Sequence, residues 1–149
     1  MKNTVLKKIL LSTAILLSAG FSSITLAHSG GATLGADASA TDLASVTCYD
    51  DGNGPADHLL IAVEDGSAPI PGLLVNMQAF KDNKMTNVTD PVSGDGNSSP
   101  EAMLRGGNGD YRISVNKTNT GLRDFEVTFH CETSNNIHTG TDINVLQVQ

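Results

Sequence analysis

The sequence has no tryptophan, and its 149 residues include only two tyrosines and four phenylalanines. Without large aromatic side chains the core must depend on aliphatic residues, and in a small domain such a core is modest. Basic residues are also few, with nine Lys and Arg against 16 Asp and Glu, for a net charge of −7. Because an acidic surface repels phosphate backbones, this composition argues against nucleic-acid binding and suits solubility or the binding of cations.

Long apolar runs are also scarce, and the single candidate lies near the start of the chain. The run 9–17 follows three lysines and precedes small residues up to Ala27, which is the pattern of a secretory signal peptide. It is shorter than the roughly 20 residues that a membrane span needs. We therefore expect a signal peptide at 1–27, with Ala-x-Ala triplets at 36–38 and 38–40 as alternative cleavage sites. Removal of the three lysines leaves six basic residues against 16 acidic ones, a net charge of −10.

Helical periodicity is absent beyond residue 27, where short alternating stretches are separated by Gly, Pro, Asn and Asp. The clearest stretch is 123–131, which has three apolar residues and Cys131 on one face and polar residues on the other. This is the pattern of a strand with one buried face. Seven or eight such strands predict an all-β fold, an antiparallel, Ig-like β-sandwich over 42–149. Residues 28–41 have little to bury, so we predict a flexible arm there.

Cysteine occurs only twice, at Cys48 and Cys131. Both fall on the apolar face of a predicted strand, and export would bring them to a compartment where disulfides persist. We predict one inter-sheet bridge, which stabilises by roughly 4–5 kcal/mol in the chain-entropy treatment of so long a loop. A thiolate metal site is disfavoured because only one of the two sulfurs is near a histidine in the sequence.

Histidine is also rare, and the four residues are informative by their positions. Cleavage after Ala27 would make His28 the first residue, and its α-amino nitrogen and ring Nδ1 could chelate one ion. One further imidazole would complete a three-nitrogen set that suits Cu(II). The available donors are His58, His130 and His138; each of these, taken alone, is also compatible with an ordinary solvated residue. The sequence therefore predicts copper binding through His28 with His130 or His138.

An exported β-sandwich that begins with His28 resembles the periplasmic copper-binding CopC-type proteins and, more distantly, the lytic polysaccharide monooxygenases. In those families the terminal histidine is a ligand, so the resemblance implies that role for His28. The chain departs from the CopC-type pattern by its cysteine pair and by the lack of a histidine two residues after the first. It departs from the monooxygenases by its short length and lack of an aromatic substrate face. The stretch 106–131 is also similar to small exported proteins of proteobacteria, a resemblance that implies no activity.

Calcium is the alternative ion. Two turns are rich in oxygen ligands, as Ca²⁺ prefers: one holds Asp50, Asp51 and Asn53, and the other holds Asp95 and Asn97. The spacing from Asp95 resembles the start of an EF-hand loop, but Gly106 stands where the loop needs its last Glu. Turns of this composition are usually only turns, so the calcium hypothesis competes with a purely structural role.

No enzyme signature is present: the sequence lacks the Gly-x-Ser-x-Gly, His-Glu-x-x-His and phosphate-loop motifs. We expect a non-catalytic, periplasmic or secreted binding protein whose partner is a metal ion or another protein. A structural or adhesive module that joins its neighbours by strand addition is a further alternative. The arm at 28–41 lacks the alternating large apolar residues that a donated strand needs.

Overall fold

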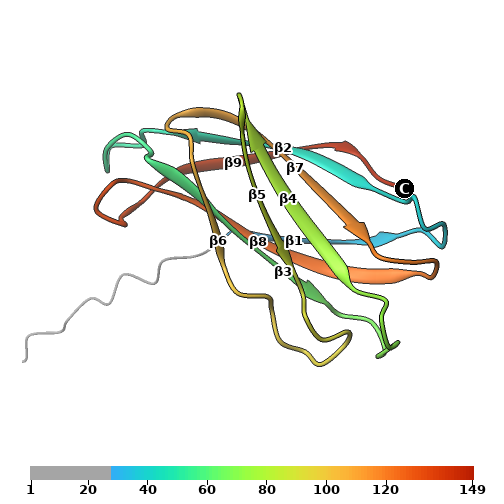
Figure 1. Cartoon of the computed structure of the whole chain (residues 1–149). Coiled ribbons are helices and arrows are strands. Elements are labelled where there is room, and N and C mark those ends of the chain that lie inside the picture. Colours follow the sequence, from blue (N-terminus) through green and yellow to red (C-terminus); the bar gives the residue numbers. More distant parts are fainter. Residues whose placement is uncertain (1–27) are drawn as a thin grey trace, which may run out of the picture.

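The computed structural model describes residues 28–149, and the predicted signal peptide lies outside the described residues. Nine β-strands and no helix occur in this part of the chain (Figure 1). The strands are β1 (His28–Leu34), β2 (Asp42–Tyr49), β3 (His58–Asp65), β4 (Val75–Lys81), β5 (Lys84–Thr89), β6 (Ala102–Arg105), β7 (Gly109–Lys117), β8 (Arg123–Glu132) and β9 (His138–Gln147). Within residues 28–149 nothing helical has the length and hydropathy of a membrane span.

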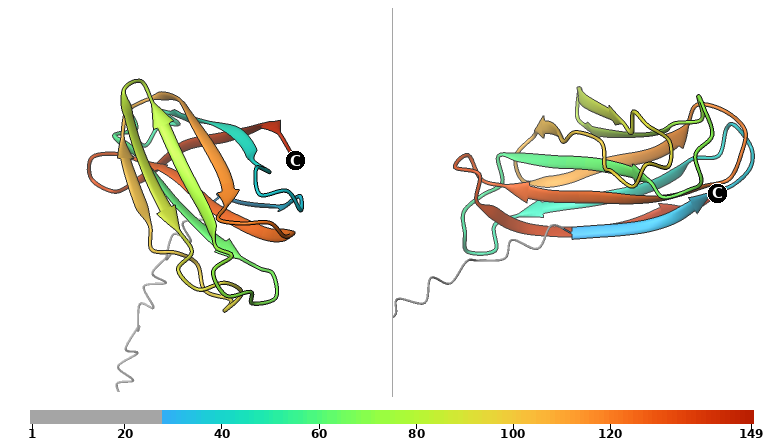
Figure 2. Two further views of the ribbon diagram at one scale, coloured as in Figure 1. Left: turned by 45° about the vertical axis from the view of Figure 1, so that its right-hand side comes forward. Right: turned by 90° about the horizontal axis from the view of Figure 1, so that it is seen from below.

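The strands form two facing layers (Figure 2). One contains β1, β8, β3 and β6, and the other contains β5, β4, β7, β2 and β9, with every pairing antiparallel. The start of β9 pairs with the end of β8, which makes the two layers continuous on that side. On the other side β5 and β6 lie close together, so the sheet is nearly closed like a barrel. The predicted all-β antiparallel class is confirmed.

Residues 28–34 differ from the expected flexible arm, because they form β1 and raise the number of strands to nine. Each residue of β1 pairs with a residue of β8, and Leu34 at its end is fully buried. Gly31 allows this close approach, since a Cβ there would lie 2.9 Å from the carbonyl oxygen of Phe125. Backbone pairing and a single buried anchor thus order a segment that carries few apolar side chains.

The predicted disulfide between Cys48 and Cys131 is confirmed, with the two Cα atoms 5.6 Å apart. It joins β2 of one layer to β8 of the other. The alternation predicted for 123–131 is also present, because Phe125, Val127 and Phe129 all belong to the buried core. A disulfide of this kind is typical of proteins that fold in an oxidising compartment.

Candidate metal centre

Three histidines gather around Glu132 where β3, β8 and β9 meet. His130 and Glu132 lie on the same face of β8 because they are two residues apart in a strand. The pairing of β8 with β9 places His138 opposite Glu132 on one side. On the other side, β3 places His58 opposite the same residue. Antiparallel pairing therefore brings side chains from three strands to one carboxylate.

The distances within this cluster are short. Nε2 of His130 lies 3.3 Å from Oε1 of Glu132, and Nε2 of His138 lies 3.7 Å from the same oxygen. The two imidazole rings stack with their centroids 4.3 Å apart. The ligand atoms of His130, Glu132 and His138 all lie within 4.8 Å of one another, and they form the one group of three or more such residues found within 28–149. Two nitrogens and one oxygen thus converge on a small volume.

The surroundings favour a neutral His130. Its side chain is only 8% exposed, and burial lowers its pKa below the ordinary value, with charge on His138 lowering that pKa further. The carboxylates of Glu132 and Glu101 oppose this change. Nδ1 of His130 is buried and finds no hydrogen-bond partner among residues 28–149. Since metals bind neutral imidazole, the site keeps this residue in the form that a metal requires.

His58 is fully buried and contacts the Oε2 atom of Glu132, whereas His130 and His138 contact Oε1. Nε2 of His58 lies 3.2 Å from Oε2 of Glu132, and its Nδ1 lies 2.9 Å from Oδ2 of Asp57. Asp57 in turn pairs with Arg105. Both imidazole nitrogens are therefore engaged by carboxylates, which suits a positioning role and not a ligand role for His58. The series Arg105, Asp57, His58 fixes the orientation of the Glu132 carboxylate.

His28 lies apart from this group. It pairs with Phe129 on β8, and its ring stacks on the Phe129 ring at 5.9 Å. Because neighbouring residues of a strand point to opposite faces, this position puts His28 on the face opposite to His130. The structure therefore brings together His58, His130 and His138 of the four predicted ligands, but not His28.

In the oxygen-rich turns proposed for calcium, the Asp side chains accept hydrogen bonds from backbone N–H groups of the same turn. Oδ1 of Asp50 accepts hydrogen bonds from the N–H groups of Gly52 and Gly54 at 2.8 and 3.0 Å. Asp51 and Asp95 accept from the N–H groups of Asn53 and Asn97 in the same way. Such bonds are the usual stabilisation of Asp-containing turns. Within residues 28–149 these turns belong to no cluster of three His, Cys, Asp or Glu ligand atoms.

Glu132 is the residue that sequence reasoning missed. The signal was present, because continuing the alternation of 123–131 by one residue puts Glu132 on the same face as His130. A His-x-Glu pair in a strand offers two ligand atoms on one side of the sheet. The approach of His138 depends on the pairing of β8 with β9, which no local pattern indicates.

Comparisons with known proteins leave the site to be interpreted from its own chemistry. No family model, no curated protein and no solved structure matches this chain.

Proposed function

We propose that this protein is an exported, non-catalytic binding protein that holds a divalent transition metal ion through His130, Glu132 and His138. The observation that carries the proposal is the convergence of three ligand atoms within 4.8 Å of one another. The Cys48–Cys131 disulfide supports a periplasmic or secreted location.

The donor set favours borderline metals. Two imidazoles and one carboxylate suit Zn(II), Cu(II) and Ni(II), whereas Ca²⁺ and Mg²⁺ prefer oxygen ligands alone. Both cysteines are in the disulfide, so no thiolate is available to select Cu(I). At a given site of nitrogen and oxygen ligands, Cu(II) binds more tightly than Zn(II). We therefore infer that Cu(II) is the preferred ion, with copper buffering or delivery as the role.

Metal binding requires a small rearrangement. With metal–ligand bonds of about 2.0–2.1 Å, neighbouring ligand atoms lie roughly 2.9 Å apart in a tetragonal Cu(II) site and roughly 3.3 Å apart in a tetrahedral Zn(II) site. Glu132 and His130 already lie close to these separations, with 3.3 Å between Nε2 and Oε1. His138 is farther away and partly exposed at the start of β9, so it is the side chain that moves. Coordination by both imidazoles would separate the stacked rings.

Metal titration of the chain 28–149 after EDTA treatment tests the proposal. We expect one Cu(II) per chain, weaker binding of Zn(II) and no binding of Ca²⁺, measured by competition with a chromogenic chelator. Glu132→Gln and His138→Gln should each weaken Cu(II) binding at least about tenfold. Equal Cu(II) affinity in the parent chain and both variants would overturn the proposal.

His28 provides the matched control. His28→Ala, and a form with one extra residue before His28, should both keep the affinity of the parent chain. A loss of affinity in these two variants, with Glu132→Gln unaffected, would instead support the N-terminal chelate predicted from the sequence.

A further inference from the structure

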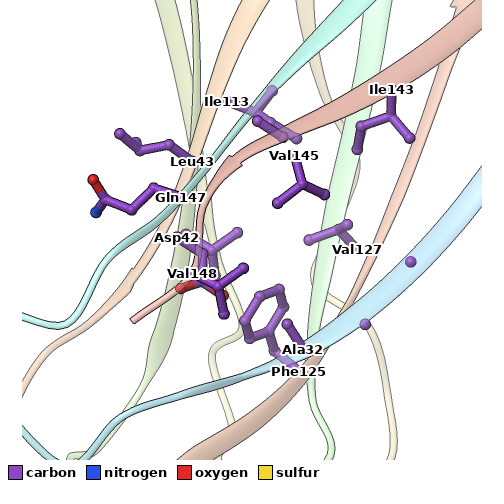
Figure 3. A pocket seen from close by; sticks show the side chains of 14 residues that line it. Ala32, Asp42, Leu43, Ile113, Phe125, Val127, Ile143, Val145, Gln147 and Val148 are labelled. Atoms are coloured by element: carbon purple, nitrogen blue, oxygen red, sulfur yellow. The ribbon is translucent and has the colours of Figure 1, made fainter.

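A second site candidate lies between the two layers, away from the metal centre. Its cavity has a volume of about 230 Å³ and is bounded by β1 and β8 on one side and by β2, β7 and β9 on the other (Figure 3). The cavity forms where the layers separate. Beyond Cys131 and Glu132, β9 leaves β8 and pairs with β2, while β1 takes its place beside β8. We call this space the inter-layer slot.

The slot is apolar and is open partly because Gly30 has no side chain. Gly30 pairs with Val127, whose side chain is in the core, and a Cβ built on Gly30 would meet nothing within 4 Å. Phe125 and Val127 form one wall, and Val145 faces them from β9 (Figure 3). Val145 is 62% exposed although it lines the slot. Apolar surface of this kind gains free energy when a ligand covers it.

Among residues 28–149, Asp42 is the only charged residue that lines the slot. The residue is 7% exposed, and its Oδ1 accepts a hydrogen bond from the N–H of Gln149 at 2.8 Å. Its Oδ2 is buried and has no hydrogen-bond partner within the described part of the chain. The amine of nearby Lys117 is bonded to the carbonyl oxygens of Gly35 and Asp37. A buried carboxylate oxygen without a donor is costly, so a ligand that supplies a donor there is favoured.

We propose that the inter-layer slot binds a small amphipathic cation, a primary amine on an apolar body. The ammonium group donates to Oδ2 of Asp42, and the body packs against Phe125, Val127 and Val145. Val148 lies beside Asp42 in Figure 3 and is 61% exposed, so its side chain moves aside to admit the ammonium group. A carboxylate-bearing ligand such as a fatty acid is disfavoured because it would place a like charge beside Asp42.

The volume sets the size of the ligand. An engineered apolar cavity of about 150 Å³ binds benzene, which has six heavy atoms. By proportion, the slot accommodates roughly nine heavy atoms at that packing. Short alkylamines and small aralkylamines fall within this limit. Longer chains would extend out of the slot past the exposed residues of β9.

Ligand titration followed by NMR of the ¹⁵N-labelled chain 28–149 tests the proposal, with EDTA present so that the metal centre does not contribute. The probes are hexylamine, hexan-1-ol and hexanoate at pH 7.5. We expect shifts at the amides of Ala32, Val127 and Val145, with hexylamine binding about tenfold more tightly than hexan-1-ol. Hexanoate should bind most weakly. Shifts elsewhere, equal affinity for amine and alcohol, or preference for hexanoate would overturn the proposal.

Two variants separate the contributions of charge and space. Asp42→Asn keeps an acceptor for the Gln149 N–H but removes the charge, so the preference for hexylamine over hexan-1-ol should fall to within twofold. Gly30→Val adds a branched side chain to the slot from a Cβ position that meets nothing within 4 Å, and it should weaken both ligands at least tenfold. The matched control is Ser29→Val, an exposed neighbour on the other face of β1, which should leave both affinities unchanged.

The competing occupant is a second copy of the chain. Sedimentation of the ligand-free protein should show a monomer at concentrations used for NMR. A dimer that Gly30→Val converts to monomer would mean that the slot is an interface between copies, and would overturn the ligand proposal. The outcome is independent of the metal titrations, because neither Asp42 nor Gly30 belongs to the metal centre.

Discussion

Strands β3 and β8 pair along their length, and a buried polar cluster lies at each end of this pair. The two clusters differ in the groups that face their carboxylates. At one end are Asp65, the last residue of β3, and Arg123, the first residue of β8. At the other end are His58, the first residue of β3, and Glu132, the last residue of β8. The same two strands, which are labelled β3 and β8 in Figure 1, thus bury charged side chains at both of their ends.

The Asp65–Arg123 end contains its own permanent cation. The two side chains are 0% and 1% exposed, and Nη1 of Arg123 lies 3.4 Å from Oδ2 of Asp65. Nη1 also donates to the carbonyl oxygen of Ala68 at 2.7 Å, and Asp65 accepts from the hydroxyl of Ser93 at 2.9 Å. Since guanidinium does not lose its proton in proteins, the positive charge of this cluster is permanent.

In the described part of the chain, the Glu132 end has no buried side chain with a permanent positive charge. The neighbours of the Glu132 carboxylate are the imidazoles of His58, His130 and His138. Under the proposed function a metal ion supplies the positive charge that arginine supplies at the other end. A permanent buried cation is therefore suited to a structural role, whereas a carboxylate that must take its cation from solution is suited to binding.

The largest expected effect follows from removing the permanent cation. Arg123→Met leaves Asp65 buried without a counter-charge and should lower the free energy of unfolding by about 3–5 kcal/mol. Urea denaturation, with the slope compared between variants, measures the change. Adding Asp65→Asn to Arg123→Met should restore part of the loss. If Arg123→Met alone were as stable as the parent chain, the structural role of the Asp65–Arg123 end would be contradicted.

Metal binding should stabilise the folded protein, and this gain should depend on the Glu132 end alone. At a free Cu(II) or Zn(II) concentration one hundred times the dissociation constant, the free energy of unfolding should rise by about 2.7 kcal/mol. Glu132→Gln should abolish this gain, whereas Arg123→Met should retain it on a less stable background. Thermal or urea unfolding with and without metal provides the measurement, and a gain that survives Glu132→Gln would place the ion elsewhere.

The metal-free protein should lose stability as the pH falls below about 6.5. Burial lowers the pKa of folded His130 below its ordinary value of 6.5. Between these two pKa values, the His130 imidazole is therefore protonated in the unfolded chain and neutral in the folded chain. Stability therefore rises with pH between the lowered pKa and 6.5 and is fully present above that range. His130→Asn should flatten this slope in EDTA-treated protein. An unchanged slope in that variant would assign the pH dependence to other groups.

The smallest effect is expected at the exposed margin of the Glu132 end. Arg105 pairs with Asp57, but its side chain is 61% exposed, and such surface pairs contribute less than about 1 kcal/mol. Arg105→Ala should therefore change the free energy of unfolding far less than Arg123→Met does. A loss comparable to that of Arg123→Met would remove the contrast between the two ends.

Local patterns predicted much of the fold. The alternation of 123–131 predicted β8 and the direction of Cys131, and with only one other cysteine the disulfide followed. The pairing of 28–34 with β8 was not predictable, because glycine, alanine and serine carry almost no apolar signal. Its stability comes from backbone bonds to residues nearly 100 positions away and from the burial of Leu34.

The candidate site was predictable only in part, for a related reason. His130 and His138 were candidates because histidine is rare in this chain, but their meeting at Glu132 depends on the pairing of β8 with β9. His28 was assigned by its expected terminal position, and its actual place is set by its register opposite Phe129. Long-range strand register, which no local period encodes, determines which side chains meet.

The position of Cys131 between His130 and Glu132 has a consequence for the order of events during maturation. A chain still in the reducing cytosol would have Cys131 unlinked, so the end of β8 and both ligands would lack their covalent tie to β2. Under the proposed function, oxidation of the two thiols after export would add this tie and restrict the movement of both ligands. The chain would then hold its metal ion less tightly in the reducing cytosol than at its destination.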